Sequence, residues 1–416
     1  MALNQSGISQ KDYFEHIRQQ MQSRPVAPAA SGEIVQAIQD LCSGSSAGEN
    51  NFLKSEDLDL SWVSFAEHHS SMSHPETTNV VANLATFAGG PGARIITLSC
   101  GTTPLDNELF PRGLVYEETK IPLMSHRQRR KPVLTADPWD MAEARTRLEK
   151  ALAQNTDDLS SRSEAIDWFE SVSGDLEELP QLWQQISVLN AKLGQSIFAE
   201  GGIQYTQVPM ELVASRVLTQ WLANGVENWV TGILTDTERF KAAVKVLDGT
   251  DGFFNIPAGR GTVFLWQRTD QALQACGQGS STQVVRPAAE WVEVLVSNAL
   301  IPSAGLAMIV LGLYLGIPNF GGLLQYDYLA DARLRLLQPA SGLTEDDRDL
   351  LAKTQDSYYV NFERRSATRG GLRRLADPIV WEELERESEL SMGAHTEDCL
   401  AWLLSSFRGG DARRVQ

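Results

Sequence analysis

Cysteine is scarce in this sequence, and its spacing excludes a disulfide framework. The 416 residues contain four cysteines, Cys42, Cys100, Cys276 and Cys399, which lie far apart and form no CxxC pair. Small secreted domains need several closely spaced cysteines, so this pattern indicates reduced thiols and predicts a cytoplasmic protein. The polar, acidic-containing N-terminal residues give no indication of a signal peptide.

Positive charge is also in deficit. Lysine and arginine total 36 against 53 aspartates and glutamates, which gives a formal net charge of −17. Phosphate backbones and anionic lipid surfaces need clustered excess positive charge, so we expect neither nucleic acid nor membrane as a partner. The apolar stretch Ala299–Ile317 is long enough to span a bilayer, but proline, glycines and acidic flanks favour a buried helix.

The familiar catalytic motifs are missing as well. The sequence contains no full Walker loop, Rossmann glycine fingerprint or H-E-x-x-H pair, and its G-x-S-x-G match at Gly44–Gly48 falls in a Ser/Gly/Asn linker rather than in a strand-to-helix elbow. Each of these motifs places particular groups at a particular spacing for one chemistry. Most hydrolase, NTPase and dehydrogenase interpretations therefore have no support in the sequence.

Two strand–turn–helix passages are present in the N-terminal half. Arg94–Leu98 is β-branched and apolar, and Pro132–Ala136 precedes a capped helix at Met141–Gln154. Such passages predict an α/β fold with a parallel-sheet core in the N-terminal half and a helix-rich C-terminal half. We expect an N-terminal helical segment at 1–60, the α/β core at 61–155, and a helix-rich region with some strands at 156–416, packed on the core.

Individual elements of the C-terminal half are also predicted. Asn228–Leu234 reads as a strand, and Gly342–Asp356 as the acidic start of a helix that Thr344 caps.

The loop after the strand Arg94–Leu98 is the first candidate site. It is small and rich in hydroxyl groups, and ligands of open α/β sheets bind at the carboxyl ends of strands. Its backbone N–H groups and hydroxyls are suited to the phosphate of a donor molecule. The predicted cofactor-binding residues here are Ser99, Gly101, Thr102 and Thr103. Cys100 is either a nucleophile at a helix N-terminus or a small buried residue.

A basic run from His126 to Lys131 is the second candidate feature. Guanidinium groups bind phosphate, sulfate or carboxylate in a bidentate manner, so Arg127, Arg129 and Arg130 are interpreted either as an anion clamp or as a solvated edge. His126 or His74 would then act as the general base.

Three of the six histidines, His68, His69 and His74, fall within one short segment. Imidazole is a common metal ligand, but adjacent histidines match no ligand spacing. We expect local hydrogen bonding rather than a metal site.

A polar segment follows the long apolar stretch. It places an amide, a carboxylate and phenols beside apolar surface, a composition typical of pockets and of subunit contacts. The predicted substrate-binding residues are Gln325, Asp327 and Tyr328.

Two short segments together resemble a known family. Ser99–Thr103 is similar to the 5′-phosphate loop of sulfotransferases that use phosphoadenosine phosphosulfate, and Asp137–Asp140 is similar to the segment before that family's 3′-phosphate serine. The chain departs from the family at Ser99, Cys100, Ala136 and Ala144. The resemblance covers about twenty residues and implies a phosphate-bearing donor.

Three functions remain open at this point. The first is a small-molecule biosynthetic transferase using a phosphate-bearing, sulfonucleotide-type donor. The second is a lyase or synthase with pyridoxal phosphate, for which Lys120 or Lys131 would form the Schiff base. The third is a non-catalytic subunit that completes a partner's site. We expect a small-molecule substrate, and either a homo-oligomer or a partner subunit; the cofactor stays unassigned.

Overall fold

The computed structural model describes most of the chain. The described residues are 9–23, 28–43, 63–102, 113–117, 119–155, 158–246, 254–258, 262–269, 272–275, 281–283, 286–321, 323–354, 358–359 and 371–389.

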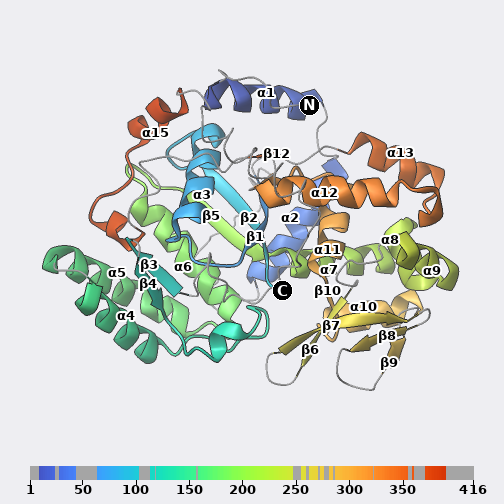
Figure 1. Ribbon diagram of the computed structural model, residues 1–416, viewed down its shortest axis with the longest axis horizontal. Helices are drawn as coiled ribbons and strands as arrows, with labels where there is room; N and C mark the ends of the chain where they lie inside the picture. The colour runs from blue at the N-terminus through green and yellow to red at the C-terminus, as the bar shows by residue number, and fades with distance from the viewer. Residues whose placement is uncertain are drawn as a thin grey trace, which may run out of the picture.

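A five-stranded parallel sheet forms the centre of the molecule (Figure 1). Its strands are β1 (Val63–His68), β2 (Arg94–Cys100), β5 (Gln204–Pro209), β11 (Phe320–Gly321) and β12 (Tyr358–Tyr359). They lie in the order β12-β11-β1-β2-β5, and every neighbouring pair is parallel. The chain therefore builds outward from β1 to β5, then returns to the other side of β1 to place β11 and β12.

The central strands are buried on both faces. Ile95, Ile96 and Leu98 of β2 are all in the core, as a parallel sheet covered on both sides requires. Strand β2 pairs with β5 over six positions, from Arg94 with Gln204 to Ser99 with Pro209.

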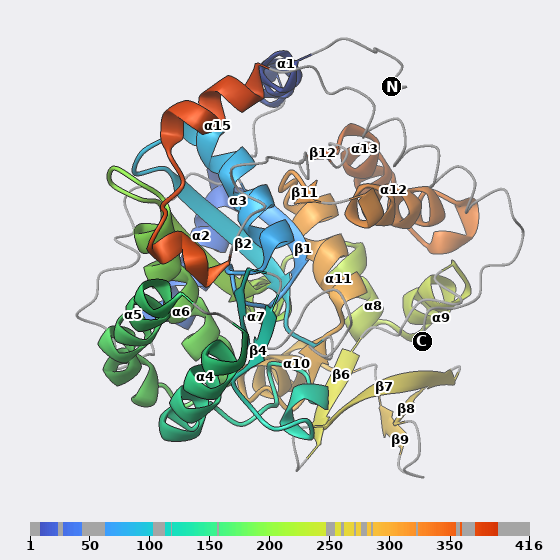
Figure 2. The same cartoon turned by 60° about the vertical axis from the view of Figure 1, so that its left-hand side comes forward.

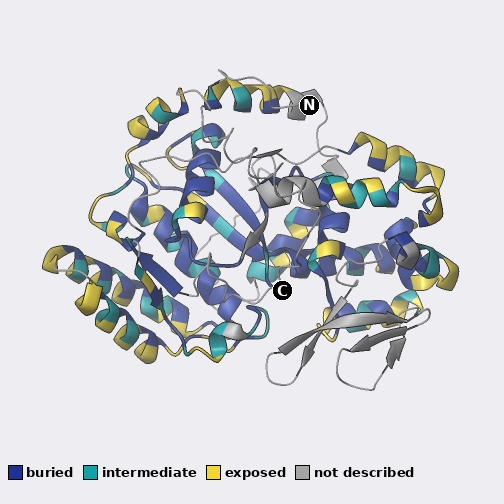
Figure 3. Ribbon diagram, viewed as in Figure 1, coloured by how far each residue is buried: buried dark blue, intermediate teal, exposed yellow. Residues whose placement is uncertain are grey.

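Helices cover both faces of this sheet. The helices α3 (Pro75–Ala88) and α6 (Leu182–Ile197) lie on one face, while α2 (Pro28–Ser43) and α7 (Met210–Ala223) lie behind the other (Figures 1 and 2). Helix α3 has proline in its first turn and ends at Gly89, whose φ of 125° favours glycine. Figure 3 shows the buried residues concentrated in the sheet and in these helices.

The remaining helices surround this core. They are α1 (Gln10–Ser23), α4 (Met141–Asn155), α5 (Leu159–Glu177), α8 (Trp229–Thr235), α9 (Thr237–Val246), α10 (Ala288–Val296), α11 (Ala304–Met308), α12 (Leu323–Leu336), α13 (Glu345–Lys353) and α15 (Trp381–Ser388). Short 3₁₀ helices occur at Gln128–Arg130, Pro339–Ser341 and Leu372–Leu375, and a buried π-helix at Ile309–Tyr314.

Two antiparallel units complete the fold. A hairpin pairs β3 (Gly113–Tyr116) with β4 (Thr119–Pro122). A second sheet has the order β10-β6-β7-β8-β9. Its strands are β6 (Phe254–Ala258), β7 (Thr262–Thr269), β8 (Ala272–Ala275), β9 (Ser281–Gln283) and β10 (Ile301–Pro302).

The predicted α/β fold is confirmed, and three of the five strands of the parallel sheet lie beyond residue 156. The long apolar stretch is buried, as predicted, although it comprises β10, α11 and the π-helix rather than one helix. Within the described residues, no helix is long and apolar enough to cross a membrane.

Two predicted strands are wrong. Pro132–Ala136 forms a turn, in which Thr135 N and Ala136 N both donate to Pro132 O. The segment Asn228–Leu234 belongs to helix α8, because Asn228 and Thr231 form a reciprocal capping box that fixes its first turn.

Candidate functional site

The carboxyl edge of the parallel sheet is the natural location for a site. Strands β1, β2 and β11 end there at His68, Cys100 and Gly321. The order of the strands reverses between β1 and β11, since β2 was added on one side of β1 and β11 on the other. In open α/β sheets, ligands bind outside the carboxyl ends of the strands at such a reversal.

The loop from β1 to α3 carries an unusual number of buried polar groups. The loop begins at His69 and ends at His74, the residue that precedes the first turn of α3. Its polar side chains, and those of the first turn of α3, are buried at His69, Ser70, Ser71, Ser73, His74, Thr77 and Thr78. Buried polar groups are tolerated only when they are hydrogen-bonded, so this loop depends on a defined network.

His69 lies at the centre of that network. Its Nε2 is 3.0 Å from Trp183 O, and its Nδ1 is 2.6 Å from Ser99 Oγ. A carbonyl oxygen can only accept, so Nε2 carries the hydrogen of the neutral ring and Nδ1 is left as an acceptor for the Ser99 hydroxyl, which also lies 3.2 Å from Val208 O. Burial lowers the pKa of His69 to about 4, partly opposed by the bond to Trp183. The imidazole is therefore neutral at pH 7 and links β1, β2 and α6.

Asn190 of α6 fixes the middle of the same loop. Its amide nitrogen donates to Ser70 O at 2.8 Å and also to the side chain of Gln207, while its oxygen accepts from Met72 N at 2.7 Å. The side chain is fully buried. A single amide thus satisfies two backbone groups of the loop that would otherwise lose their hydrogen bonds to water.

The hairpin and the C-terminal segment hold the loop from another side. Ser73 Oγ accepts from Val115 N of β3 at 3.0 Å and lies 2.8 Å from Ser71 Oγ. Gly371 packs so closely that a Cβ there would stand 2.1 Å from Val115 O and 3.1 Å from Ser73 O. The β1–α3 loop is therefore held by elements from four separate parts of the chain.

A second polar centre lies at the end of β2. Glu211, in the first turn of α7, accepts from Gly101 N at 2.9 Å, Thr102 N at 3.0 Å and Thr102 Oγ1 at 2.7 Å. The carboxyl is fully buried, and burial raises its pKa while these hydrogen bonds lower it. Donors expected to bind a phosphate are thus bonded to a carboxylate of the chain itself.

The structure brings some predicted site residues together. Ser99, Cys100, Gly101 and Thr102 lie at the end of β2, and Ser99 contacts His69 directly. His74 is buried at the start of α3, in the loop that follows β1, the strand next to β2. Cys100 is half-buried and forms no disulfide. Thr103 lies outside the described residues.

The basic run is placed on a turn and a short 3₁₀ helix. His126 and Arg127 are exposed, and Arg129 is half-buried. For Arg130, only the backbone is described. The turn that follows contacts the end of β2, where Leu134 N donates to Gly101 O at 3.2 Å.

The remaining predicted residues lie on α12, on β4 and at the end of the basic run. Gln325, Asp327 and Tyr328 lie in the first turns of α12, where the backbone alone is described. Lys120 is exposed on β4, and Lys131 pairs with Asp137 at 2.8 Å. Among the described side chains, no group of three potential ligands could hold a metal ion; the side chain of His68 is not among them.

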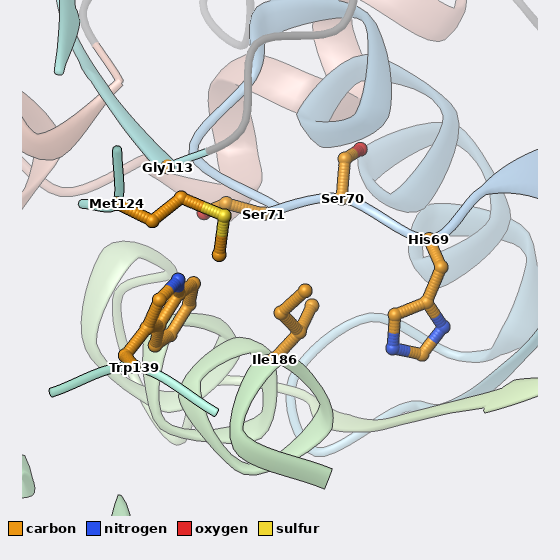
Figure 4. Close-up of a pocket in the computed structure, with 7 residues that line it drawn as sticks. All are labelled: His69, Ser70, Ser71, Gly113, Met124, Trp139 and Ile186. Atoms are coloured by element: carbon orange, nitrogen blue, oxygen red, sulfur yellow. The ribbon is translucent and has the colours of Figure 1, made fainter. Parts of the chain in front are cut away.

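A small cavity adjoins the β1–α3 loop. It is lined by His69, Ser70, Ser71, Gly113, Met124, Trp139 and Ile186 (Figure 4). Its volume is about 10 Å³, close to the minimum that one water molecule requires.

Sequence reasoning missed the residues that organise this edge. Asn190 and Glu211 stand within helices whose neighbours are mostly apolar, at positions that are completely buried. A polar residue on the apolar face of a predicted helix is the signal that could have indicated them. Their partners, Met72 and Gly101, lie more than one hundred positions away.

Comparison with known proteins adds no assignment. No protein-family model matches the chain, and a search of curated proteins found no significant match.

Proposed function

We propose that this protein is a small-molecule transferase whose nucleotide-type donor binds at the carboxyl edge of the parallel sheet, between β1 and β11. The observation that carries the proposal is the reversal of strand order at β1. The order β12-β11-β1-β2-β5 is that of a doubly wound sheet, and such sheets bind nucleotides at this position.

The chemistry of the β1–α3 loop supports the proposal. The loop leads directly into the N-terminus of the fourteen-residue helix α3, where backbone N–H groups and the helix dipole favour an anion. The network around His69 and Asn190 holds this loop in one conformation, and a rigid loop binds a ligand at a lower entropic cost.

In this proposal, some of the predicted anion-binding residues are better suited than others. Because Gly101 N and Thr102 N bind Glu211, a donor phosphate would have to compete there with a buried carboxylate. The N-terminus of α3 is therefore the better anion site in this proposal. His74 lies at that terminus and is the preferred general base, whereas His126 is exposed on a turn.

Native mass spectrometry of the full chain tests donor binding. The panel contains ATP, NAD, S-adenosylmethionine, phosphoadenosine phosphosulfate and pyridoxal phosphate. We expect one nucleoside-containing compound to bind with 1:1 stoichiometry. Retention of pyridoxal phosphate alone, or of no compound, would contradict the proposal.

Three variants then locate the bound donor. His74→Ala is expected to weaken binding about tenfold, the effect of losing one hydrogen bond to a charged group. His126→Ala serves as the matched histidine control, and Thr102→Val tests the loop after β2, because the Thr102 hydroxyl contacts Glu211. If Thr102→Val weakened binding while His74→Ala did not, the donor phosphate would sit at β2 instead.

A further inference from the structure

The cavity beside the β1–α3 loop contains a hydrogen-bond donor without a partner. Trp139 is 5% exposed, and its indole Nε1 has no hydrogen-bond partner in the described structure. In Figure 4, this nitrogen is on the edge of the ring that faces Met124 and Ser71. A buried donor without a partner destabilises the folded state, so such groups are rare unless something binds them.

The other tryptophans show how exceptional this is. In the part of the chain where side chains are described, the six other indole nitrogens each donate to an oxygen within the protein. These bonds run from Trp168 to Ser196, Trp183 to Gln181, Trp221 to Glu33, Trp229 to Ser341, Trp291 to Leu234 and Trp381 to Ala199. Among the described tryptophans, the unpaired state is therefore confined to Trp139, the one that lines the cavity.

Trp139 is also held firmly in place. Its backbone N donates to Gln185 Oε1 at 2.6 Å, and Gln185 Nε2 donates to Trp139 O at 3.3 Å and to Leu176 O at 3.0 Å. Gln185 is buried in α6, the helix that also supplies Asn190. These bonds fix the backbone of Trp139 and burial confines its ring, so the indole lies beside the β1–α3 loop before any ligand arrives, as expected of a preorganised binding group.

The lining determines which oxygen can bind. Met124 and Ile186 form apolar walls, no cationic side chain lines the cavity, and both nitrogens of the neutral His69 are already bonded. A carboxylate or phosphate here would be buried opposite one neutral donor, which is strongly unfavourable. The volume of about 10 Å³ is that of one water-sized sphere, so the cavity admits a single oxygen atom and the rest of a ligand would lie outside it.

We propose that this cavity is a subsite for a neutral hydroxyl or carbonyl oxygen of the acceptor substrate, with Trp139 Nε1 as its hydrogen-bond donor. The assignment to the acceptor rests on the proposed transferase function. Ser71 contributes to the same site: when Ser73 Oγ donates across their 2.8 Å contact, Ser71 keeps its hydroxyl hydrogen for the bound oxygen.

The test uses the full chain labelled with ¹⁵N at its indole nitrogens. The Trp139 resonance is the one missing from Trp139→Phe, which keeps the ring contacts; if that variant does not fold, proximity to the Met124 methyl group assigns it. Formamide and methanol are the neutral probes, and acetate at the same concentration is the anionic control. We expect the neutral probes to move the Trp139 resonance in a saturable way, while Trp291 and Trp229 stay unchanged.

Two results would overturn the proposal. One is an equal shift with acetate, since the site would then accept an anion. The other is a long-lived water signal at Trp139 that neither neutral probe displaces, which would make the cavity a structural water site. Because no donor is present in these titrations, a failure here is distinguishable from a failure of donor binding in native mass spectrometry.

Discussion

His69 shows how one side chain connects stability to pH. Its imidazole is neutral and buried, and both ring nitrogens are bonded within the protein. An unfolded chain binds a proton at this residue near pH 6.5, while the folded chain resists protonation until the pH falls to about 4. The folded state therefore has its full stability above pH 6.5 and loses the His69 contribution as the pH falls through this window.

We expect the free energy of unfolding to fall by about 2 kcal/mol between pH 7 and pH 5 because of His69 alone. Urea denaturation at the two pH values measures this change. His69→Gln removes the titrating group and should flatten the dependence by that amount, whereas His126→Gln, at an exposed position, should not. An unchanged pH dependence in His69→Gln would show that other groups control acid stability.

Among the elements, α6 supports the β1–α3 loop through the buried amide of Asn190, while the buried amide of Gln185, on the same helix, holds the backbone of Trp139. Asn190→Ala leaves Ser70 O, Met72 N and the Gln207 side chain without that partner. We expect a loss of about 2–4 kcal/mol in the free energy of unfolding, since several buried groups lose a hydrogen bond together. Asn155→Ala, at an exposed position in α4, is the control and should change stability by less than about 0.5 kcal/mol.

The docking of the C-terminal segment depends on Gly371. Its φ of 48° and the 2.1 Å approach of a Cβ to Val115 O both exclude a side chain. We expect Gly371→Ala to lower the free energy of unfolding by about 3 kcal/mol or more, which urea denaturation would measure. Alternatively, residues 371–389 detach from the rest of the protein, which limited proteolysis would detect. Gly305→Ala is the matched control. Gly305 lies in α11, and the nearest neighbour of a Cβ added there would be Ser303 Oγ at 3.8 Å, so the substitution should leave the free energy of unfolding unchanged or raise it slightly.

Local signals in the sequence were sufficient for some elements and not for others. The β-branched run Arg94–Leu98 predicted β2, and Thr344 predicted the start of α13, where it forms a capping box with Asp347. Strands β11 and β12 contain two residues each, so they carry no periodicity to detect. The β-branched residues of Asn228–Leu234 indicate a strand, whereas the capping box of Asn228 favours the observed helix.

The candidate site was also predictable only in part, because only some of its residues belong to a local sequence pattern. The end of β2 follows from a local pattern of strand and turn, and the structure places Ser99 to Thr102 there. Whether these residues bind a donor stays a prediction. Glu211, which occupies the backbone donors of Gly101 and Thr102, comes from a helix far along the chain, and its buried position follows only from the assembled fold.

At the scale of the whole molecule, the parallel sheet joins distant parts of the chain. Strands β5, β11 and β12 come from beyond residue 156, while β1 and β2 lie before it. We therefore expect a fragment of residues 61–155 to be unfolded, because β1 and β2 would lack neighbours on both outer sides. Circular dichroism and chemical-shift dispersion would show this, with the full chain as control; a cooperatively folded fragment would contradict it.

The pairing of Ser64 with Phe320 has a consequence for biosynthesis. When the ribosome has completed β1, β2 and β5, one side of β1 still presents unpaired backbone groups, and it stays so until β11 emerges much later. An open strand edge of this kind promotes association with other chains. The candidate ligand-binding edge and the protection of β1 against association are therefore both completed only when β11 is synthesised.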